Sequence, residues 1–362
     1  MRALAQSGWH VHGADTRLFS LGLRSRYAAA PYELLPPERD AFLPALLTLI
    51  ERLRPDVLIP VRGTEQAVYA RDALLAYTNC LLASPESFQI LNDKLRLLEH
   101  CGAYGIAAPD VFEPAQARRR LQADPGSRVV IKPRRDVGGG RGVRIIADPA
   151  VVDATYHEVT AAHGGALISD FIPGPVDNLR AVQLLFDADS RPIAFFVMRK
   201  LRIWPPRVGV TVAAVSTHET ELLDGLIPLL QALKWRGPVD AEFKIDSRDG
   251  KARILEINPR FSGAVHFPIA CGLNLPDLYG RAALGERLEL ARLPAYRAGL
   301  YYLETRRWLV ALGAELREPG ERRWVRLRRV WRTELGRPRV PSVNRLIDPA
   351  PMLGKLLLRG GD

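Results

Sequence analysis

The chain contains little cysteine and no long apolar run. Cys80, Cys101 and Cys271 are its only cysteines; they are widely spaced, odd in number and without a Cys-x-x-Cys pair. We therefore expect neither a disulfide framework nor a zinc site. We expect the protein to lie in a reduced, cytoplasmic compartment. The sequence has no run of about 18 apolar residues, so no membrane-spanning helix is predicted. Residues 1–16 also lack the apolar core of a signal peptide.

The composition is that of a globular protein, with 47% hydrophobic and 25% charged residues. A length of 362 residues is enough for two or three domains. The net charge of +11 is uneven, because the segment from Tyr301 onward has 14 Arg and Lys residues against 7 Asp and Glu. The rest of the chain is only mildly basic, so its charge does not argue for binding to nucleic acid.

Residues 1 to about 86 alternate short predicted strands (9–14, 56–60, 80–83) with predicted helices (39–54, 64–77). Such alternation is typical of a parallel sheet with crossover helices. The chain opens with what looks like the tail of a first helix, whereas such a domain normally opens with a strand. We therefore expect an α/β domain that apparently lacks its first strand and is under-packed. A misassigned start codon and a natively trimmed domain are both possible reasons, and we favour the first.

A predicted β-hairpin over residues 240–263 is the segment around which the chain is organised. Two alternating runs flank the turn SRDGK, where Asp249-Gly250 supplies the positive φ that such turns require. Pairing the runs brings Glu242 near Glu256, and Asn258 shares the face of Glu256. Two carboxylates and an amide oxygen on one face suit Mg²⁺ or Mn²⁺. An ordinary exposed hairpin with scattered charges is the alternative.

A lysine at a strand end precedes a glycine-rich loop. Lys132 ends a predicted strand over 128–132, and DVGGGRGV follows at 136–143. The glycines of this loop let a backbone hairpin lie over a polyphosphate. Lys132 would neutralise part of the negative charge of the phosphates. The glycines are Gly138, Gly139, Gly140 and Gly142. No Gly-Lys-Ser/Thr follows, which excludes a Walker loop, and a strand comes next, which excludes a dinucleotide fingerprint. The alternative is a surface turn with an incidental lysine.

The predicted strand over 166–172 is a candidate for contact with a purine. Its backbone would pair with the base edge while Phe171 and Ile172 lie against the ring, and Asp177 after the turn would reach ribose hydroxyls. An ordinary core strand is the alternative.

Arg199, Lys200 and Arg202 place three cations within four residues. They form either a solvated strand end or a cluster that faces phosphate or a substrate carboxylate. His266 is more typical of a core histidine than of a catalyst.

The basic C-terminal segment contains apolar residues at roughly helical spacing among arginines: Trp324, Leu327, Trp331 and Leu335. We expect a helix that packs its tryptophan face on the body and leaves the arginines in solvent. Binding of this segment to anionic lipid, RNA or a partner is the alternative.

In their order, these segments resemble the ATP-grasp superfamily of ligases over roughly residues 84–285. The resemblance rests on Asn92-Asp93-Lys94, Ile131-Lys132-Pro133, the GGGRG loop, SDFIPG, Glu242 and Glu256-x-Asn258-Pro-Arg260. The segments RKLRxxPPxxG and VDAEFK…LEINPRFSG look like a bacterial branch of predicted carboxylate–amine ligases. They are also similar to biotin carboxylase and to the carbamoyl phosphate synthase large chain.

The resemblance implies a mixed α/β and α+β fold. A parallel-sheet pre-ATP-grasp domain would occupy residues 1–86 and the ATP-grasp domain residues 87–290, with a lid at about 113–172. A basic extension would follow over 291–362. Two departures affect the adenosine contacts: Ser169 stands where many relatives have glutamate, and Val176 where a ribose-binding acid is frequent, with Asp177 beside it.

The resemblance also implies roles for individual residues. Lys94 and Lys132 would hold phosphates and the adenine edge beneath the loop from Gly138 to Gly142. The backbone of Asp170 and Ile172 would read the adenine. Glu242, Glu256 and Asn258 would bind two Mg²⁺ ions. Arg260 would bind the phosphorylated oxygen of the substrate, and Lys200 and Arg199 would be further cations of the site.

The implied reaction uses ATP and Mg²⁺ (or Mn²⁺) to phosphorylate a carboxylate, and the acyl phosphate is then attacked by an amine. Small-molecule acids and amines are the expected partners, a homodimer is possible, and nucleic acid is not expected. The alternatives are an ATP-binding protein without ligase activity and a protein that binds membranes or nucleic acid through its basic tail.

Overall fold

The computed structural model describes residues 1–16, 20, 22–135, 137–289, 296–317, 322–335 and 339–341. Asp136, at the start of the glycine loop, and the side chain of Leu335 lie outside the described part of the chain. None of the helices in that part combines the length and the apolar character that a membrane crossing requires.

The N-terminal region contains a short parallel sheet, as expected. Strands β1 (Gly13–Asp15) and β2 (Pro31–Glu33) pair in parallel. The helices around them are α1 (Arg2–Gln6), α2 (Phe42–Leu53), α3 (Thr64–Tyr69) and α4 (Arg71–Leu75). The helix predicted over 64–77 is thus two helices. The strands predicted over 56–60 and 80–83 were wrong, and only one parallel bridge, Val57 to Asn79, forms near them.

A cavity explains why the segment at 56–60 does not form a full strand. It measures about 380 Å³, and both β1 and residues 57–61 contribute to its lining. A strand needs a neighbour for its backbone N–H and C=O groups, and here a largely apolar space lies on that side.

A four-stranded sheet forms the smaller lobe, which we call the lid. Its order is β3-β6-β4-β5, with β3 (Val111–Phe112), β4 (Val129–Pro133), β5 (Arg144–Ile146) and β6 (Ala166–Asp170). Helices α7 (Pro114–Ala123) and α8 (Val152–His163) cover one face. Sequence reasoning missed α7, although proline in its first turn and a capping box of Glu113 with Gln116 mark its start.

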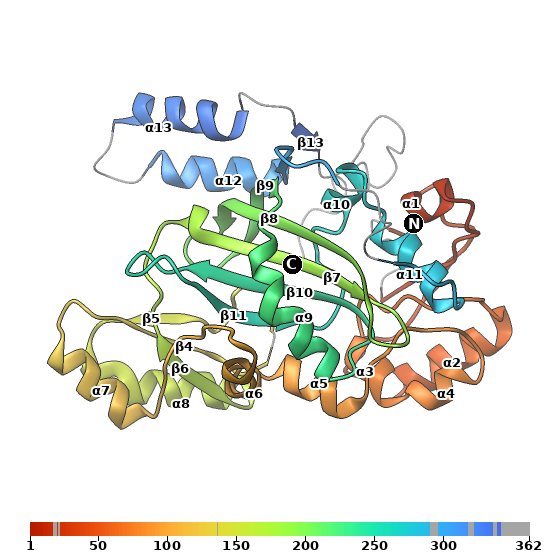
Figure 1. Ribbon diagram of the computed structural model, residues 1–362, viewed down its shortest axis with the longest axis horizontal. Coiled ribbons are helices and arrows are strands. Elements are labelled where there is room, and N and C mark those ends of the chain that lie inside the picture. Colours follow the sequence, from red (N-terminus) through yellow and green to blue (C-terminus); the bar gives the residue numbers. More distant parts are fainter. Residues whose placement is uncertain are drawn as a thin grey trace.

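A seven-stranded sheet is the centre of the molecule, with the order β11-β10-β7-β8-β9-β12-β13. Its members are β7 (Leu179–Phe186), β8 (Pro192–Trp204), β9 (Val210–Thr217), β10 (Gly237–Ile245), β11 (Ala252–Asn258), β12 (Tyr301–Leu303) and β13 (Arg339–Pro341). β7 and β8 pair as an antiparallel hairpin. In Figure 1 the lid lies below one end of this sheet, and helices α2, α3 and α4 lie below the other end.

Helices cover both faces of the large sheet because alternate residues of its strands are apolar on each side. Val182, Leu184 and Phe186 of β7 face one core, together with α5 (Pro85–Asn92), α6 (Lys94–Cys101) and α9 (Leu223–Ala232). Ala181 and Leu185 face the other core, together with α10 (His266–Ala270) and α11 (Leu275–Ala283). Ser84 caps α5, where its side chain accepts a hydrogen bond from the Ser87 amide.

The described C-terminal segment forms α12 (Thr305–Glu315) and α13 (Arg323–Val330), which continues into a π-helical turn at Trp331–Leu335. The two helices lie side by side along one edge of the molecule (Figure 1). The expectation that α13 packs its tryptophan face on the body was wrong. Trp324 and Trp331 are 57% and 63% exposed, whereas Arg326 and Val330 are buried.

Candidate active site

A cavity of about 580 Å³ lies between the lid and the large sheet. Strands β4, β5 and β6 supply one wall, and β8, β10 and β11 supply the other. Most of the site residues expected from the sequence line it: Lys94, Lys132, Gly138, Gly139, Gly140, Asp170, Phe171, Ile172, Lys200, Glu242, Glu256, Asn258 and Arg260. Segments distant in the sequence are therefore brought together in one place.

The β10–β11 hairpin brings its acidic residues together. Glu242 is the direct cross-strand partner of Glu256, and Asp240 is that of Asn258. The pairing steps from Glu242 with Glu256 to Phe243 with Ile254, so Leu255 is an extra residue in a β-bulge. Because of this extra residue, the buried Ile254 faces the core while Glu256 faces the cavity.

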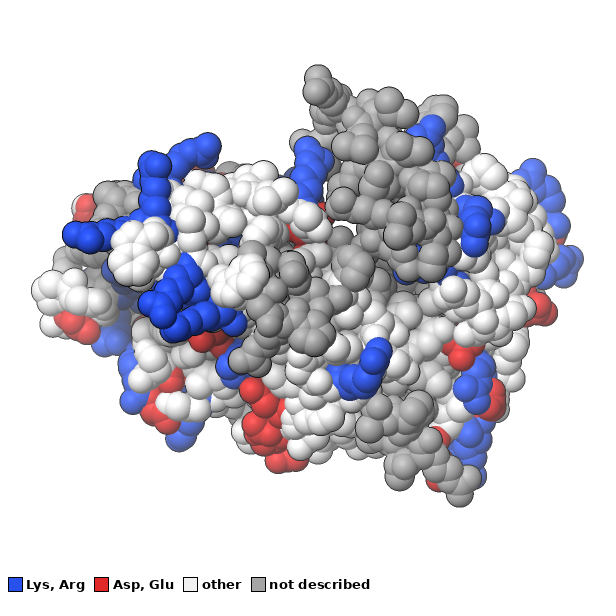
Figure 2. Space-filling model, turned by 90° about the horizontal axis from the view of Figure 1, so that it is seen from above, with Lys and Arg blue, Asp and Glu red and all other residues white. Residues whose placement is uncertain are grey.

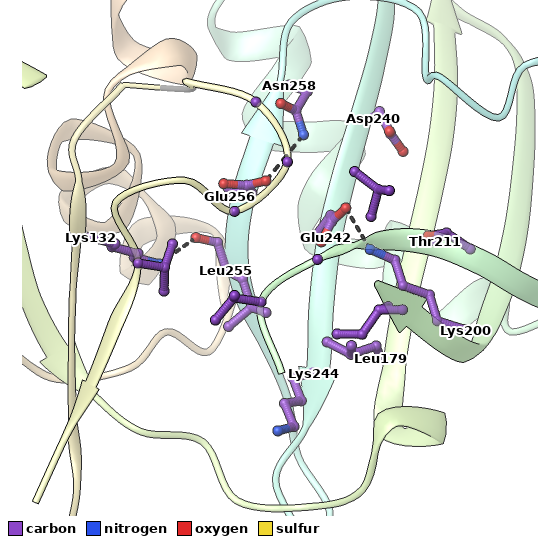
Figure 3. Close-up of a pocket in the computed structure, with 18 of the residues that line it drawn as sticks. Lys132, Leu179, Lys200, Thr211, Asp240, Glu242, Lys244, Leu255, Glu256 and Asn258 are labelled. Atoms are coloured by element: carbon purple, nitrogen blue, oxygen red, sulfur yellow. Dashed lines mark hydrogen bonds and ion pairs between the residues drawn. The ribbon is translucent and has the colours of Figure 1, made fainter. Parts of the chain in front are cut away.

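Both glutamates contact lysines. Lys200 Nζ lies 2.6 Å from Glu242 Oε1, and Lys94 Nζ lies 3.1 Å from Glu256 Oε2. Figure 3 shows the first of these pairs beside the neighbouring strand, which carries Glu256 and Asn258. Burial alone raises the pKa of Glu256, but the ammonium groups of Lys94 and Lys132 outweigh it, and the pKa falls to about 2. Glu256 is thus an anion throughout the physiological range.

Lys132 reaches from the lid to the large sheet. Its Nζ donates to the carbonyl oxygen of Leu255 at 3.1 Å (Figure 3). Burial and the nearby Lys94 lower the pKa of Lys132 to about 8, although Glu256 opposes the shift. An anion beside this lysine would stabilise its charged form.

The start of α6 fixes Lys94. Asp93 is the N-cap of that helix and accepts from the backbone of Leu95. The same carboxylate binds the guanidinium of Arg134 at 2.6 Å, and the Lys94 amide donates to the Arg134 carbonyl at 2.9 Å. Because the lid segment after β4 is bound to α6, Lys94 of α6 and Lys132 of β4 are positioned together.

Asp240 is a site residue that sequence reasoning missed. It lines the cavity, is 6% exposed, and its Oδ1 atom is buried without a hydrogen-bond partner. Burial and the Glu242 carboxylate raise its pKa to about 7. The signal was available, because Asp240 precedes Glu242 by two residues and therefore shares its face of the strand.

The glycine loop closes against the turn between β8 and β9. Gly138, Gly139, Gly140 and Gly142 have φ between 65° and 74°, a region that glycine occupies without strain. A Cβ on Gly140 would lie 1.6 Å from the Val208 carbonyl oxygen. The loop and that turn therefore touch at the cavity, and only glycine fits at this contact. Gly142 lies beside Pro133 and His163 and does not line the cavity.

The segment from Ser169 to Ile172 lines the lid wall of the cavity. The Asp170 amide donates to the Asp110 carbonyl at 2.8 Å, and its side chain binds Arg248 at 2.8 Å. The Asp170 amide therefore already has a hydrogen-bond partner, so fewer backbone groups of this segment are left to bind a base. Asp177 is exposed in a 3-10 turn and does not line the cavity. The structure does not bring it to the site.

The three cations of β8 have separate surroundings. Lys200 is 3% exposed and faces the cavity. Arg199, the next residue, does not line the cavity, because successive side chains of a strand point to opposite faces. Arg202 instead pairs with Glu334 at 2.8 Å and with Glu315. Of the expected cation cluster, only Lys200 lies in the site.

Arg260 and His266 lie at the end of the cavity beyond the acidic residues. Arg260 Nη2 donates to Asn258 Oδ1 at 3.2 Å, which orients that amide. The His266 Nε2 atom is buried without a partner, and its ring lies 4.9 Å from that of Tyr302. Burial lowers the pKa of His266 to about 4, so its imidazole is neutral. Arg307 also lines this end.

The donor set fits Mg²⁺ shared with phosphates. Within the described residues no group of three or more His, Cys, Asp or Glu side chains is placed to hold a metal ion. Mg²⁺, however, is usually bound by one or two carboxylates together with substrate phosphates. Glu242 and Glu256 supply the two carboxylates, Asn258 an amide, and Asp240 a buried oxygen without a partner.

The chain matches known proteins in sequence. A family described as "ATP-grasp in the biosynthetic pathway with Ter operon" matches residues 203–306. The D-aspartate ligase of Enterococcus faecium is 26% identical over 111 residues, which cover 30% of this chain and 26% of that protein. The carbamoyl phosphate synthase large chain of Deinococcus radiodurans is 26% identical over 300 residues, covering 76% of this chain and 28% of that protein. The chain thus spans about a quarter of these curated relatives.

Solved structures share its fold. The biotin carboxylase domain of Hydrogenobacter thermophilus 2-oxoglutarate carboxylase, described as a dimer in complex with MgADP, ADP and bicarbonate, superposes with a TM-score of 0.63 and 19% identity, covering 83% of this chain and 69% of that chain. N5-carboxyaminoimidazole synthetase from Staphylococcus aureus gives a TM-score of 0.60 and 15% identity, covering 80% and 74%. The chain therefore has the ATP-grasp fold, and its residues 203–306 match an ATP-grasp family.

Proposed function

We propose that the chain is an ATP-dependent ligase that phosphorylates a carboxylate and couples the resulting acyl phosphate to an amine, releasing ADP and phosphate. The observation that carries this proposal is the convergence of three lysines and an arginine with two glutamates and an asparagine in one cavity. Carboxylate and triphosphate are both anions, so their reaction requires cations on every side. A homodimer, the state described for the Hydrogenobacter domain, is part of this proposal.

In the proposed complex, the triphosphate lies beneath the glycine loop. Lys132 exchanges the Leu255 carbonyl for phosphate oxygens, and Lys94 neutralises the same group. Glu242, Glu256 and Asn258 would hold Mg²⁺, which supplies charge neutralisation and polarises the phosphoryl oxygens. Phe171 and Ile172 line the part of the lid wall where the base would lie.

The acid and the amine would enter from the other end of the cavity. Arg260 would bind the carboxylate oxygen that accepts the phosphoryl group, and both Arg260 and Lys200 line the cavity. The reaction forms a carbonyl–oxygen–phosphorus bond and breaks the bond between the β- and γ-phosphates. The amine nitrogen then forms the C–N bond, phosphate leaves, and the amine proton passes to solvent or phosphate.

Nucleotide binding tests the site without knowledge of the acid. Titration calorimetry with ATP should show tighter binding by the wild type in Mg²⁺ than in EDTA. Glu256→Gln should remove this difference, because one carboxylate ligand is lost, and Lys132→Met should weaken binding in both buffers. Glu158→Gln, at an exposed ion pair on α8, is the matched control. An unchanged Mg²⁺ dependence in Glu256→Gln contradicts the metal assignment.

Turnover tests the ligase assignment. ADP and phosphate release should appear with at least one pair from a panel of carboxylic acids and amines. Glu256→Ala and Asn258→Ala should abolish that release while the unfolding midpoint stays close to that of the wild type. Nucleotide binding without turnover on any pair would favour the alternative of a non-catalytic ATP-binding protein.

A further inference from the structure

An apolar stripe on α13 faces solvent. Trp324, Leu327 and Trp331 are 57%, 47% and 63% exposed. Their spacing of three and four residues places them on one side of the helix. The stripe is about 10 Å long, since a helix rises about 1.5 Å per residue. Figure 2 shows basic side chains gathered around uncharged ones at the end of this face where α13 lies.

The body-facing side of α13 is already packed. Val330 is 1% exposed and lies in a small core with Trp308 and Leu303. Arg326 is 6% exposed, and its guanidinium donates to the Glu315 carbonyl. The helix therefore cannot turn its tryptophans inward without exposing Val330 and breaking this hydrogen bond.

The turn after α13 is also fixed. Glu334 is 3% exposed and accepts from both Arg202 and the Trp308 indole. Buried charged pairs are strongly destabilised when one partner moves away. The outward direction of the stripe is thus set by a buried polar network rather than by chance.

The charge around the stripe is positive. Residues 322–334 contain six arginines and one acidic residue, the buried Glu334. The arginines at the surface of this segment are Arg322, Arg323, Arg328, Arg329 and Arg332. On the neighbouring helix α12, Leu309 and Val310 are also 56% and 50% exposed.

We propose that the outer face of α13 docks on an anionic lipid surface. Tryptophan favours the boundary between headgroups and acyl chains, arginine binds lipid phosphates, and an aliphatic residue between two tryptophans is suited to hydrocarbon. Leu327 distinguishes this surface from one for nucleic acid, which would gain nothing from an exposed leucine. The first turn of α12 also borders the catalytic cavity through Arg307, so docking would bring that cavity close to the membrane surface.

Vesicle binding by the full chain tests this proposal. The wild type should sediment with phosphatidylserine-containing vesicles and not with pure phosphatidylcholine vesicles, and rising salt should weaken its binding. Arg328→Gln and Arg332→Gln should each reduce the affinity roughly fivefold. Trp324→Ser with Trp331→Ser should remove most of the blue shift of tryptophan fluorescence on anionic vesicles, since Trp235 and Trp308 are buried and Trp9 and Trp204 are only partly exposed.

Charge-matched controls separate docking from general basicity. Arg39→Gln and Arg119→Gln alter exposed arginines of other elements and should leave vesicle binding unchanged, and unfolding midpoints establish that each variant is folded. Equal binding to neutral and anionic vesicles, or equal losses in the control variants, would overturn the proposal. Salt-sensitive binding to a single-stranded RNA, abolished by the α13 substitutions and without vesicle binding, would assign the surface to nucleic acid instead.

Discussion

The charged residues of the cavity stabilise one another in pairs. Lys200 contacts Glu242 at 2.6 Å, and Lys94 contacts Glu256 at 3.1 Å. A buried charge is costly unless it is paired, and removal of one partner leaves the other uncompensated. The same pairs can separate when phosphates and a divalent cation offer new partners. Each of these four charged side chains therefore has an oppositely charged partner in the chain by itself.

His266 gives the stability of the chain a dependence on pH. Its pKa is about 4 in the folded chain, lowered by burial from the ordinary value of 6.5. Between these values the unfolded chain binds the proton more readily, so stability falls as the pH is lowered. We expect the wild type to lose about 1–2 kcal/mol from this residue between about pH 7 and pH 5. Urea unfolding at both pH values measures the loss.

The matched variant is His266→Gln, which has no titrating ring. All other groups titrate alike in the two proteins, so the difference between their pH dependences isolates this histidine. Identical pH dependences would mean that the ring is protonated as readily in the folded chain as in the unfolded one.

Among the structural elements, strands that carry the site were the most predictable from the sequence. The turn at Asp249-Gly250, the strand that ends at Lys132 and the hairpin of β7 with β8 all have strong local signals. Elements defined by distant contacts were less predictable. The segment at 56–60 has an apolar strand pattern, but no neighbouring strand completes it. Helix α13 has a helical pattern, but its buried side is set by Glu315 and Arg202.

The link between β8 and the C-terminal helices predicts a large effect of one substitution. Glu334→Gln removes the charge that pairs with the partly buried Arg202. We expect a loss of about 3 kcal/mol in the free energy of unfolding, as for other broken buried pairs. Thermal and urea unfolding measure it. Glu158→Gln, at an exposed pair, should change stability by less than about 1 kcal/mol. Similar small losses in both variants would show that the Glu334 pair contributes little.

At the scale of the whole molecule, the order of motifs along the chain was enough to predict the ATP-grasp fold and the two lobes that enclose the cavity. It could not show which cations enter the cavity. Arg199 and Lys200 are adjacent in sequence, yet only the latter faces the site, because strand register decides between them. The spacing of two residues between Asp240 and Glu242 could have pointed to Asp240, but the absence of a hydrogen-bond partner for its Oδ1 atom needed the structure.

The N-terminal region should open more readily than the central sheet. Its parallel strands are three residues long, and a cavity of about 380 Å³ lies beside them. Regions with few buried contacts exchange their amide hydrogens through local opening. Hydrogen exchange followed by mass spectrometry should show residues 11–16 and 22–34 exchanging on the order of 100-fold faster than residues 181–198. Equal protection in these residue ranges would contradict this view of the region.

The extra residue at Leu255 has a consequence for how the site tolerates mutation. The atom that accepts the hydrogen bond from Lys132 is a main-chain carbonyl oxygen, which every amino acid possesses. Replacing the leucine leaves this acceptor in place, whereas deleting the residue removes it. Conservative apolar substitutions at 255 should therefore leave the position of Lys132 unchanged, because the length of the strand, rather than the side chain at 255, determines where the lysine ammonium lies.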